Sequence, residues 1–581
     1  MALRVSRTIG HQKVMPPEED VPPAHRTTDL LVAGLFLAMG LFVTARLWRD
    51  LEHRRVEINS DHSQFMWFLR HAVRVVTEGA DPFYSYLINA PDGVNLMANT
   101  AALGLTLPMV PVTMLFGPQV SFVVLLALGL AATAFGWYWV FSRHLVASRW
   151  AAAIGGAFCG FAPGMISHAN GHINWTAQFL VPFIVFASLR LRTWKDGILL
   201  GFLVVYQAFI NEEVLLYTAL ALAVFMGAYA WLTRTPIKVV LPGLGVAGAI
   251  ALVLLAYPLY RQFFGGQTYS GLPESVAHYR ADLASYPAFS RLSFGGMSTN
   301  SRLAWNISEE NTFFGWPFLL IAVGVTIWLW QRALVKALAI TGITFFILSL
   351  GTNLMVGRRG TGIPLPWALL EKVPLLGHVL VVRFALVLIP IFGALLALTV
   401  SLIEKLPDPR YRGLAVLGLV AALLPILPVP IPVRGQPTTP EFVTSGAWRN
   451  WVSTGQTVAA VPLTSEEFPR AMEWQRFSDD FALAGGYFLG PGGTDGRARF
   501  GAPPRPTAIL IREVYRSGNV PVVTAKMQQE LREDVAFWRA AALVLPDETL
   551  RGTELRLLLN QLAGPGWHVL DVTVWDVRAM G

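Results

Sequence analysis

Long stretches of apolar residues, separated by short polar connections, run through most of the chain from residue 29 to residue 431. A helix needs about 20 mostly apolar residues to cross a bilayer, so each long stretch is a candidate transmembrane helix. The candidates are residues 29–46, 119–141, 150–165, 174–190, 196–210, 214–232, 238–258, 313–331, 335–351, 383–403 and 413–431. The pattern predicts a polytopic α-helical membrane protein with about eleven spans.

The charges in the connections predict the side of the membrane on which each connection lies, because Lys and Arg in short loops favour the cytoplasm. With the N-terminus inside, the short inside loops are 143–149, 190–195, 234–238, 331–336 and 404–412, and each carries basic residues. The outside connections are then 47–118, 166–173, 211–213, 259–312 and 352–382, followed by a tail from about residue 432. We expect a multi-pass protein of the cytoplasmic membrane with a cytoplasmic N-terminus and an extracytoplasmic C-terminus.

One apolar segment, residues 101–116, does not fit this alternation. It is short and contains Pro108 and Pro111, which interrupt a regular helix. We therefore interpret it as an interfacial or re-entrant segment on the outer side. If it crossed the membrane instead, every later loop would change sides.

The last part of the chain has a different pattern. Alternating apolar and polar residues in Val458–Leu463 and His568–Val577 predict strands, and Met527–Ala541 has a helical pattern. The expected organisation is a cytoplasmic tail (1–28), a transmembrane domain (29–431) with long outward loops 47–118 and 259–312, and an extracytoplasmic mixed α/β domain (432–581).

Composition supports the membrane assignment and excludes several other classes. Of 581 residues, 54% are hydrophobic and 14% are charged, against roughly a quarter charged in an average soluble protein. The net charge of +8 does not indicate a nucleic-acid partner, because many basic residues lie where membrane orientation places them. The single Cys159 excludes a disulfide framework and a cysteine-rich metal site. The first apolar run is not followed by a small-residue cleavage pattern, so we expect it to be retained.

The first outward loop contains a candidate catalytic carboxylate, Asp61. Apolar residues at Phe65, Phe68, Leu69 and Ala72 predict a helix that lies on the membrane surface. Asp61 is then either the N-cap of this helix or a carboxylate that accepts a proton or binds a metal. Its neighbours His62, Gln64 and Trp67 are candidate substrate contacts.

Two further clusters lie in outward loops. Asp92 and Asn95, beside Pro91 and Gly93, indicate either a rigid surface loop or substrate contacts. His168 and His172 are four residues apart, but Gly171 between them weakens a helix. With Asn170 they either form a metal site, or contact phosphate or sugar hydroxyls, or are simply polar residues at the membrane interface.

Charged residues also lie at the outer ends of the predicted spans. Glu212 and Glu213 lie between two long apolar runs. They are either part of a solvated turn or a pair of functional carboxylates. Arg383 begins a span, where it either snorkels or binds a lipid phosphate through its planar fork. Arg280 and Glu309 belong to the large loop 259–312.

The chain resembles the GT-C superfamily of membrane glycosyltransferases that use polyprenyl-phosphate sugars. The resemblance covers roughly residues 29–400 and rests on an acid in the loop after the first span (Asp61), interfacial helices in that loop, the polar loop His168–His172, the large loop 259–312 and the polar outward tail. The text Asp61-x-x-Gln64-Phe65-x-Trp67-Phe68-Leu69, followed by Pro91-Asp92-Gly93-Val94-Asn95-Leu96, also looks like that of actinobacterial membrane proteins near this superfamily.

The resemblance implies an enzyme at the outer face of a bacterial cytoplasmic membrane. It would transfer a hexose or pentose, with inversion, from a polyprenyl-phosphate donor to a cell-envelope glycan or glycolipid. Asp61 would be the base. Glu212 or Glu213 would orient the acceptor, or would act as the base in place of Asp61. Arg383 and Arg280 would stabilise the departing phosphate, and His168 and His172 would hold phosphate, sugar or metal. A divalent ion such as Mg or Mn is a candidate cofactor.

This sequence departs from the family in two places. Many members pair the first acid with a second one, whereas His62 follows Asp61 here, and others carry acids where this chain has His168 and His172. Two alternatives therefore remain. One is a lipid or glycan transporter, which would need ionisable groups within its spans. The other is a non-catalytic scaffold that binds glycan.

Overall fold

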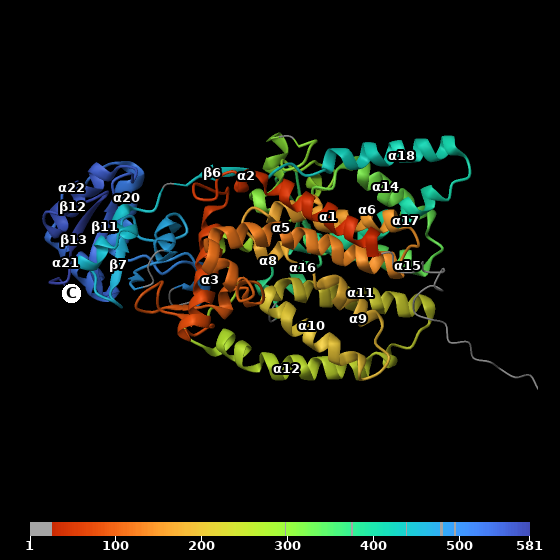
Figure 1. The fold of residues 1–581 in the computed structure, drawn as a ribbon, viewed down its shortest axis with the longest axis horizontal. Helices are drawn as coiled ribbons and strands as arrows, with labels where there is room; N and C mark the ends of the chain where they lie inside the picture. The colour runs from red at the N-terminus through yellow and green to blue at the C-terminus, as the bar shows by residue number, and fades with distance from the viewer. Residues whose placement is uncertain are drawn as a thin grey trace, which may run out of the picture.

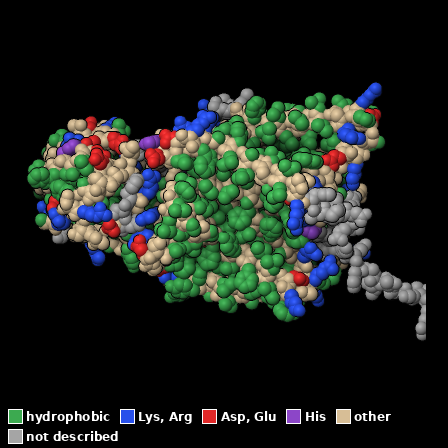
Figure 2. All heavy atoms as spheres, in the orientation of Figure 1, with side chains coloured by type: hydrophobic (Ala, Val, Ile, Leu, Met, Phe, Trp, Pro, Cys, Tyr) green, Lys and Arg blue, Asp and Glu red, His purple; other side chains and the backbone are tan. Residues whose placement is uncertain are grey.

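The computed structural model describes residues 26–296, 298–373, 376–436, 438–476, 480–492 and 496–580. A long helical bundle forms one part of the molecule, and a sheet domain lies against one end of it (Figure 1). Figure 2 shows hydrophobic side chains covering the middle of the bundle, with Lys and Arg gathered towards its ends. Most of the expected cytoplasmic tail, residues 1–25, lies outside the described residues.

Every predicted apolar run forms helix. Seven helices in the described ranges are long and apolar enough to cross a membrane, and four more are apolar but shorter. The seven are α1 (Arg26–Val43), α5 (Val110–His144), α6 with α7 (Arg149–His168), α11 (Glu212–Thr233), α12 (Leu241–Phe264), η7 with α17 (Val381–Glu404) and α18 with η8 (Pro409–Ile426). The four are α8 with α9 (Ile173–Leu189), α10 (Asp196–Ile210), α14 (Trp316–Trp328) and α15 (Ala333–Ser349). The number of spans and their orientation stay predictions.

Residues 101–116 do not form a separate long helix. They contain the short α4 (Leu103–Thr106) and the first turns of α5, which bends at Gly117 (φ 84°, ψ 165°) just before Pro118. The bend arises because Pro118 removes a backbone donor and restricts the residue before it to a non-helical conformation. The segment therefore leads into the following apolar helix, with Pro111 in the first turn of α5. An interfacial or re-entrant position of this segment stays a prediction.

Small residues bring the central helices of the bundle close together. In α6 (Arg149–Phe161), a Cβ on Gly156 would lie 2.7 Å from the Ala134 carbonyl oxygen of α5. A Cβ on Gly155 would lie 2.5 Å from the Gly393 carbonyl oxygen of α17 (Leu388–Glu404). Helices in lipid associate largely through such close packing, since lipid tails are as apolar as the helices. These contacts fix the central helices on which the polar loops rest.

The sheet domain contains a five-stranded mixed sheet in the order β12-β13-β11-β7-β8. The strands are β7 (Thr457–Ala460), β8 (Ala482–Leu483), β11 (Ala540–Pro546), β12 (Trp567–Val569) and β13 (Val572–Asp576). The helices α20 (Pro506–Ser517), α21 (Ala525–Trp538) and α22 (Gly552–Ala563) belong to this domain. The expected helix 527–541 is α21, but the expected strand 568–577 is an antiparallel hairpin that turns at Leu570 (φ 57°). The alternation continues across the turn and hides it.

Hydrogen bonds join the sheet domain to the loop after the first helix. That loop contains α3 (Asn59–Glu78), whose Ser63 hydroxyl donates to the buried Glu473 at 2.8 Å. The Trp67 indole donates to Gln475 at 2.6 Å. A short ladder also pairs β1 (Arg54–Val56) with β6 (Val433–Gly435). The two parts therefore meet through buried polar contacts around α3.

Candidate active site

Asp61 lies where α3, the turn between α7 and α8, and the sheet domain meet. It is the third residue of α3, and the N-cap is Ile58, so the interpretation of Asp61 as a helix cap is wrong. One carboxylate oxygen accepts a hydrogen bond from the Tyr487 hydroxyl at 2.9 Å, and the other lies 3.2 Å from Nε2 of His172. The Asp61 side chain keeps 16% of its surface exposed, so a ligand can reach it.

Gly171 allows the histidine turn to approach Asp61. The helix α7 (Pro163–His168) ends at His168, and Gly171 has a φ of 137°, which L residues rarely adopt. A Cβ at this position would lie only 3.1 Å from Cβ of Asp61. The two histidines therefore do not lie on one continuous helix. Gly171 interrupts the helix between them, and this interruption brings His172 to the Asp61 carboxylate.

A chain of ring contacts continues from His172 into the bundle. Nδ1 of His172 lies 3.0 Å from Nδ1 of His168. The His168 ring stacks on Trp175 with centroids 4.9 Å apart, and the Arg383 guanidinium lies 4.7 Å from the centre of the Trp175 ring. Both nitrogens of His172 are therefore engaged, one with Asp61 and one with His168. The contacts connect Asp61 to Arg383 through three side chains of the segment from the end of α7 to α8.

Arg383, in the first turns of η7 (Val381–Val387), is held by two carboxylates from distant parts of the chain. Its Nε donates to Glu309 at 3.0 Å, and its Nη1 donates to Glu213 at 3.1 Å. Glu309 is almost fully buried, with 2% of its side chain exposed, whereas Glu213 is 24% exposed. Arg383 therefore does not snorkel freely to the interface, because its cation completes a buried ionic cluster.

Glu212 and Glu213 have separate partners, because successive residues on a helix point about 100° apart. Glu213 binds Arg383 and accepts a hydrogen bond from Tyr217, one turn further along α11. Glu212 accepts a hydrogen bond from Gln262 of α12 at 2.7 Å. The interpretation of this pair as a simple solvated turn is wrong, and Glu213 is the member that joins the Arg383 cluster.

The electrostatic surroundings keep Asp61 ionised. Burial raises the pKa of its carboxyl, but the charge and hydrogen bond of His172, the hydrogen bond of Tyr487 and the charge of Arg383 together hold that pKa below its usual value. Burial and the nearby Asp61 carboxylate raise the pKa of Glu466, which comes from the sheet domain. Burial and the same carboxylate raise the pKa of Tyr487, so its hydroxyl stays a donor. At neutral pH the site presents an anionic acceptor at Asp61.

The three neighbours of Asp61 on α3 face the protein interior in different ways. His62 is fully buried, and its Nε2 lies 2.7 Å from the amide oxygen of Gln119. Gln64 donates to the Tyr487 carbonyl at 3.3 Å, and the Trp67 indole is bound to Gln475. The structure therefore gives these candidate substrate contacts a role in packing α3 against its neighbours.

The remaining candidates lie around the site or outside it. Asp92 is exposed in its loop, and the Asn95 amide donates to the Arg261 carbonyl at 2.7 Å, as expected of a rigid loop. Asn170 is buried and donates to the Ser167 carbonyl at 3.1 Å. The Arg280 side chain packs beside Gly351, where a Cβ would approach it to 2.8 Å.

Asp61, His168 and His172 were candidate ligands for a divalent metal. In the described parts of the chain no three His, Cys, Asp or Glu side chains come together as a ligand set. The two nitrogens of His172 already face Asp61 and His168, and Mg or Mn prefers several oxygen ligands, of which this group supplies one carboxylate. The residues in this arrangement do not fit such an ion.

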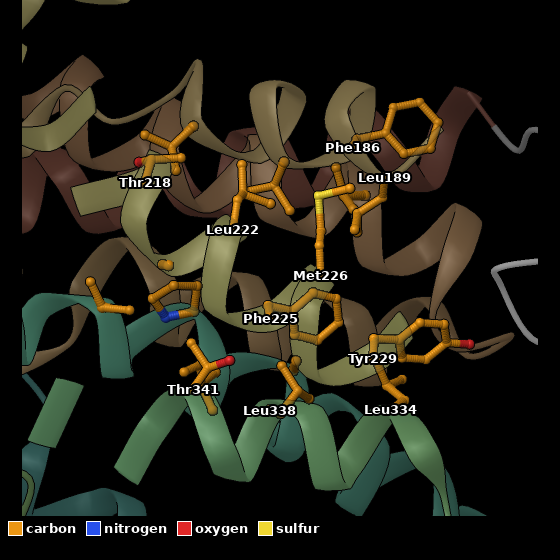
Figure 3. A pocket seen from close by; sticks show the side chains of 18 of the residues that line it. Phe186, Leu189, Thr218, Leu222, Phe225, Met226, Tyr229, Leu334, Leu338 and Thr341 are labelled. Atoms are coloured by element: carbon orange, nitrogen blue, oxygen red, sulfur yellow. The ribbon is translucent and has the colours of Figure 1, made fainter. Parts of the chain in front are cut away.

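An apolar cavity of about 840 Å³ ends beside the Arg383 cluster. Trp175 and Tyr217 line this end, and both also contact the cluster, Trp175 through Arg383 and Tyr217 through Glu213. Figure 3 shows Leu222, Phe225 and Met226 of α11 in the pocket, with Leu338 of α15 opposite. The cavity thus has apolar walls within the bundle, and the Arg383 cluster lies just beyond one of its ends.

Several residues of the site were missed at the sequence level. Tyr217 follows Glu213 by one helical turn, and that spacing is a usable signal. Trp175 lies three residues after His172 in a short helix, which is a weaker signal. Tyr487 comes from a different domain, 426 positions from Asp61, and no local pattern marks it.

Comparison with known proteins finds a likeness of fold to solved structures. The chain matches no protein-family model, and no curated protein matches it either. The structure of the mycobacterial arabinofuranosyltransferase AftD is similar over 95% of this chain and 40% of its own, with a TM-score of 0.55 and 14% identity. The oligosaccharyltransferase AglB of Archaeoglobus fulgidus, solved with an inhibitory peptide and a dolichol-phosphate, is similar over 90% of this chain and 70% of its own, with a TM-score of 0.47 and 10% identity.

At 14% identity the likeness to AftD is one of fold, and the chain spans less than half of the length of AftD. The chain therefore shares its fold with the arabinofuranosyltransferase AftD.

Proposed function

We propose that this chain is a membrane glycosyltransferase that transfers a sugar from a polyprenyl-phosphate donor to a glycan or glycolipid of the cell envelope. The observation that carries the proposal is the position of Asp61. An ionised and accessible carboxylate is joined through His172, His168 and Trp175 to Arg383, at the end of a deep apolar cavity. Such a site suits a substrate with a long apolar chain and an anionic head.

The donor lipid would place its prenyl chain in the cavity and its phosphate near Arg383. Arg383 already binds Glu309 and Glu213, so a phosphate must displace one carboxylate or share the guanidinium. Glu213 is the more exposed partner and is the one expected to give way. The planar guanidinium binds carboxylate and phosphate oxygens with the same geometry, which favours this exchange.

Asp61 would act on the acceptor. As the acceptor hydroxyl attacks the anomeric carbon, the bond to the phosphate oxygen breaks, and Asp61 takes the hydroxyl proton. His172 and Tyr487 hold the carboxylate in place through its two oxygens. A single displacement of this kind inverts the configuration of the sugar. The outer face of the cytoplasmic membrane is the side that the charge pattern predicts for this site.

The test compares two matched substitutions in the same loop, Asp61→Asn and Asp92→Asn. Each is expressed in a strain that lacks the protein, and the linkages of the envelope glycans are measured by mass spectrometry at matched protein levels. Asp61→Asn should reduce the transferred sugar about 100-fold or more, as expected for loss of a general base. Asp92→Asn should restore the wild-type profile, because Asp92 is exposed in its loop.

A wild-type glycan profile with Asp61→Asn would overturn the assignment of the base. A glycan profile that is the same with and without the wild-type protein would overturn the proposed function itself. Binding of a polyprenyl-phosphate sugar without transfer, by the purified wild-type protein, would indicate the non-catalytic scaffold.

A further inference from the structure

The apolar cavity extends far beyond the candidate active site. One face of α11 lines it at helical spacing, from Val214 near the site to Thr233 at the opposite end. These 19 steps along a helix correspond to about 28 Å, close to the roughly 30 Å thickness of the hydrocarbon core. The cavity therefore reaches from the Arg383 cluster to the opposite end of the bundle.

Two arginines line the far end of the cavity. Arg234, just after α11, and Arg192, in the turn before α10, are both exposed. Arg190 lies beside them, with its guanidinium 5.1 Å from the centre of the Phe186 ring, which also lines the cavity. A prenyl chain has no charge, so a donor lipid that enters from the Arg383 end gives these cations nothing to bind.

Two other arginines predicted on the same side of the membrane, Arg143 and Arg149, are neutralised within the protein. Asp29 binds Arg143 at 2.6 Å and Arg149 at 2.7 Å. Among the described residues no ion pair involves the Arg192 or Arg234 guanidinium, although the Asp196 carboxylate accepts a hydrogen bond from the Arg192 backbone N–H at 3.0 Å. The far mouth of the cavity therefore combines an apolar interior with two exposed guanidiniums, neither of which forms an ion pair with a described residue.

We propose that this mouth binds an anionic phospholipid from the leaflet opposite the Asp61 site. Its headgroup phosphate would lie at Arg192 and Arg234, and an acyl chain would fill the nearby part of the cavity, around Phe186, Leu189 and Leu334. Arginine suits this headgroup because its planar fork binds phosphate oxygens in pairs. The site does not depend on the proposed glycosyl transfer, and the phospholipid would limit the space left for a chain entering from the Arg383 end.

The experiment measures lipid retention by the full-length protein in detergent with native mass spectrometry. Delipidated protein is mixed with equal amounts of dioleoylphosphatidylglycerol and dioleoylphosphatidylcholine. The wild type should retain the anionic lipid selectively. Arg192→Gln with Arg234→Gln should weaken that retention roughly 25-fold, about fivefold for each arginine. The matched control, Arg332→Gln with Arg410→Gln, removes two exposed cations that do not line the cavity, and should keep wild-type selectivity.

A second measurement tests the acyl chain without any substitution. Dihexanoylphosphatidylglycerol has the same headgroup but chains too short to fill the cavity, and it should bind the wild type at least about tenfold more weakly. Unchanged selectivity in the Arg192/Arg234 variant would overturn the proposal. An equal loss in the control pair would reduce the effect to general surface charge, and equal binding of the short-chain lipid would show that the cavity takes no part. Either result also overturns it.

Discussion

Nε2 of His172 lies 3.2 Å from the Asp61 carboxylate, while Nδ1 of the same ring lies 3.0 Å from His168. One imidazole thus connects the accessible acid to the interior of the bundle. Because the other Asp61 oxygen is bound to Tyr487, the carboxylate is held from two sides by residues of two different domains. Its orientation and its ionisation both depend on these partners.

Replacing His172 should change the pH dependence of the reaction. In His172→Gln the attraction that lowers the pKa of Asp61 is lost, so that pKa rises. A carboxylate with a raised pKa is protonated at higher pH, so the acid limb of the activity profile should move towards neutral. Tyr487→Phe removes a hydrogen bond from the same carboxylate and should move the limb in the same direction. Profiles of sugar transfer against pH that coincide with wild type would contradict this role.

Gly171→Ala should disturb the contact between the histidine turn and Asp61. The new Cβ would meet Asp61 at 3.1 Å, and the φ of 137° is unfavourable for any L side chain. We expect a loss of about 1–3 kcal/mol in stability, together with reduced activity. The control is Gly248→Ala in α12, where nothing lies within 4 Å of the added Cβ. That change should be neutral or slightly stabilising, and thermal unfolding of both variants in the same detergent compares them.

Removal of Arg383 should be costly because it leaves two acids without their cation. In Arg383→Met the Glu309 carboxylate, which is only 2% accessible, stays buried without its cation. A loss of about 3–5 kcal/mol in folding stability is expected. Adding Glu309→Gln to Arg383→Met should recover part of the loss, since it removes the buried charge. Thermal unfolding of the two single variants and the double variant measures the coupling. Additive losses would show that the pair contributes nothing as a pair.

Acidification should weaken the packing of α3 through its buried histidine. Burial lowers the pKa of His62 to about 4, against an ordinary value of 6.5. Between these values the unfolded chain binds a proton that the folded protein excludes, so stability is complete above pH 6.5 and falls as the pH drops towards 4. The slope is at most about 1.4 kcal/mol per pH unit for one group.

The measurement is the apparent melting temperature of wild type and His62→Gln between pH 7 and pH 4. The variant should show a shallower fall, because the side chain at position 62 no longer titrates. His53→Gln changes a histidine whose side chain is 51% exposed and should leave the slope almost unchanged. Parallel curves for wild type and His62→Gln would contradict the assignment of this pH dependence to His62.

The sequence was sufficient for the features that depend on local pattern. Runs of apolar residues become helices whatever their partners are, since a backbone in lipid must satisfy its own hydrogen bonds. The helix with Asp61, the polar turn with His168 and His172, and the mixed α/β character of the tail were likewise visible in short windows of sequence.

Tertiary structure alone decided which of the polar residues meet. Glu212 and Glu213 are equivalent in sequence, but only Glu213 faces Arg383, because the helix turns by about 100° between them. His62 and Asp61 are adjacent, yet one is in the core and the other is accessible. Tyr487 reaches Asp61 across 426 positions, and the cavity with its cationic far end is built from helices that are distant in sequence. Such contacts depend on how the helices and the sheet domain pack, and no local pattern encodes that.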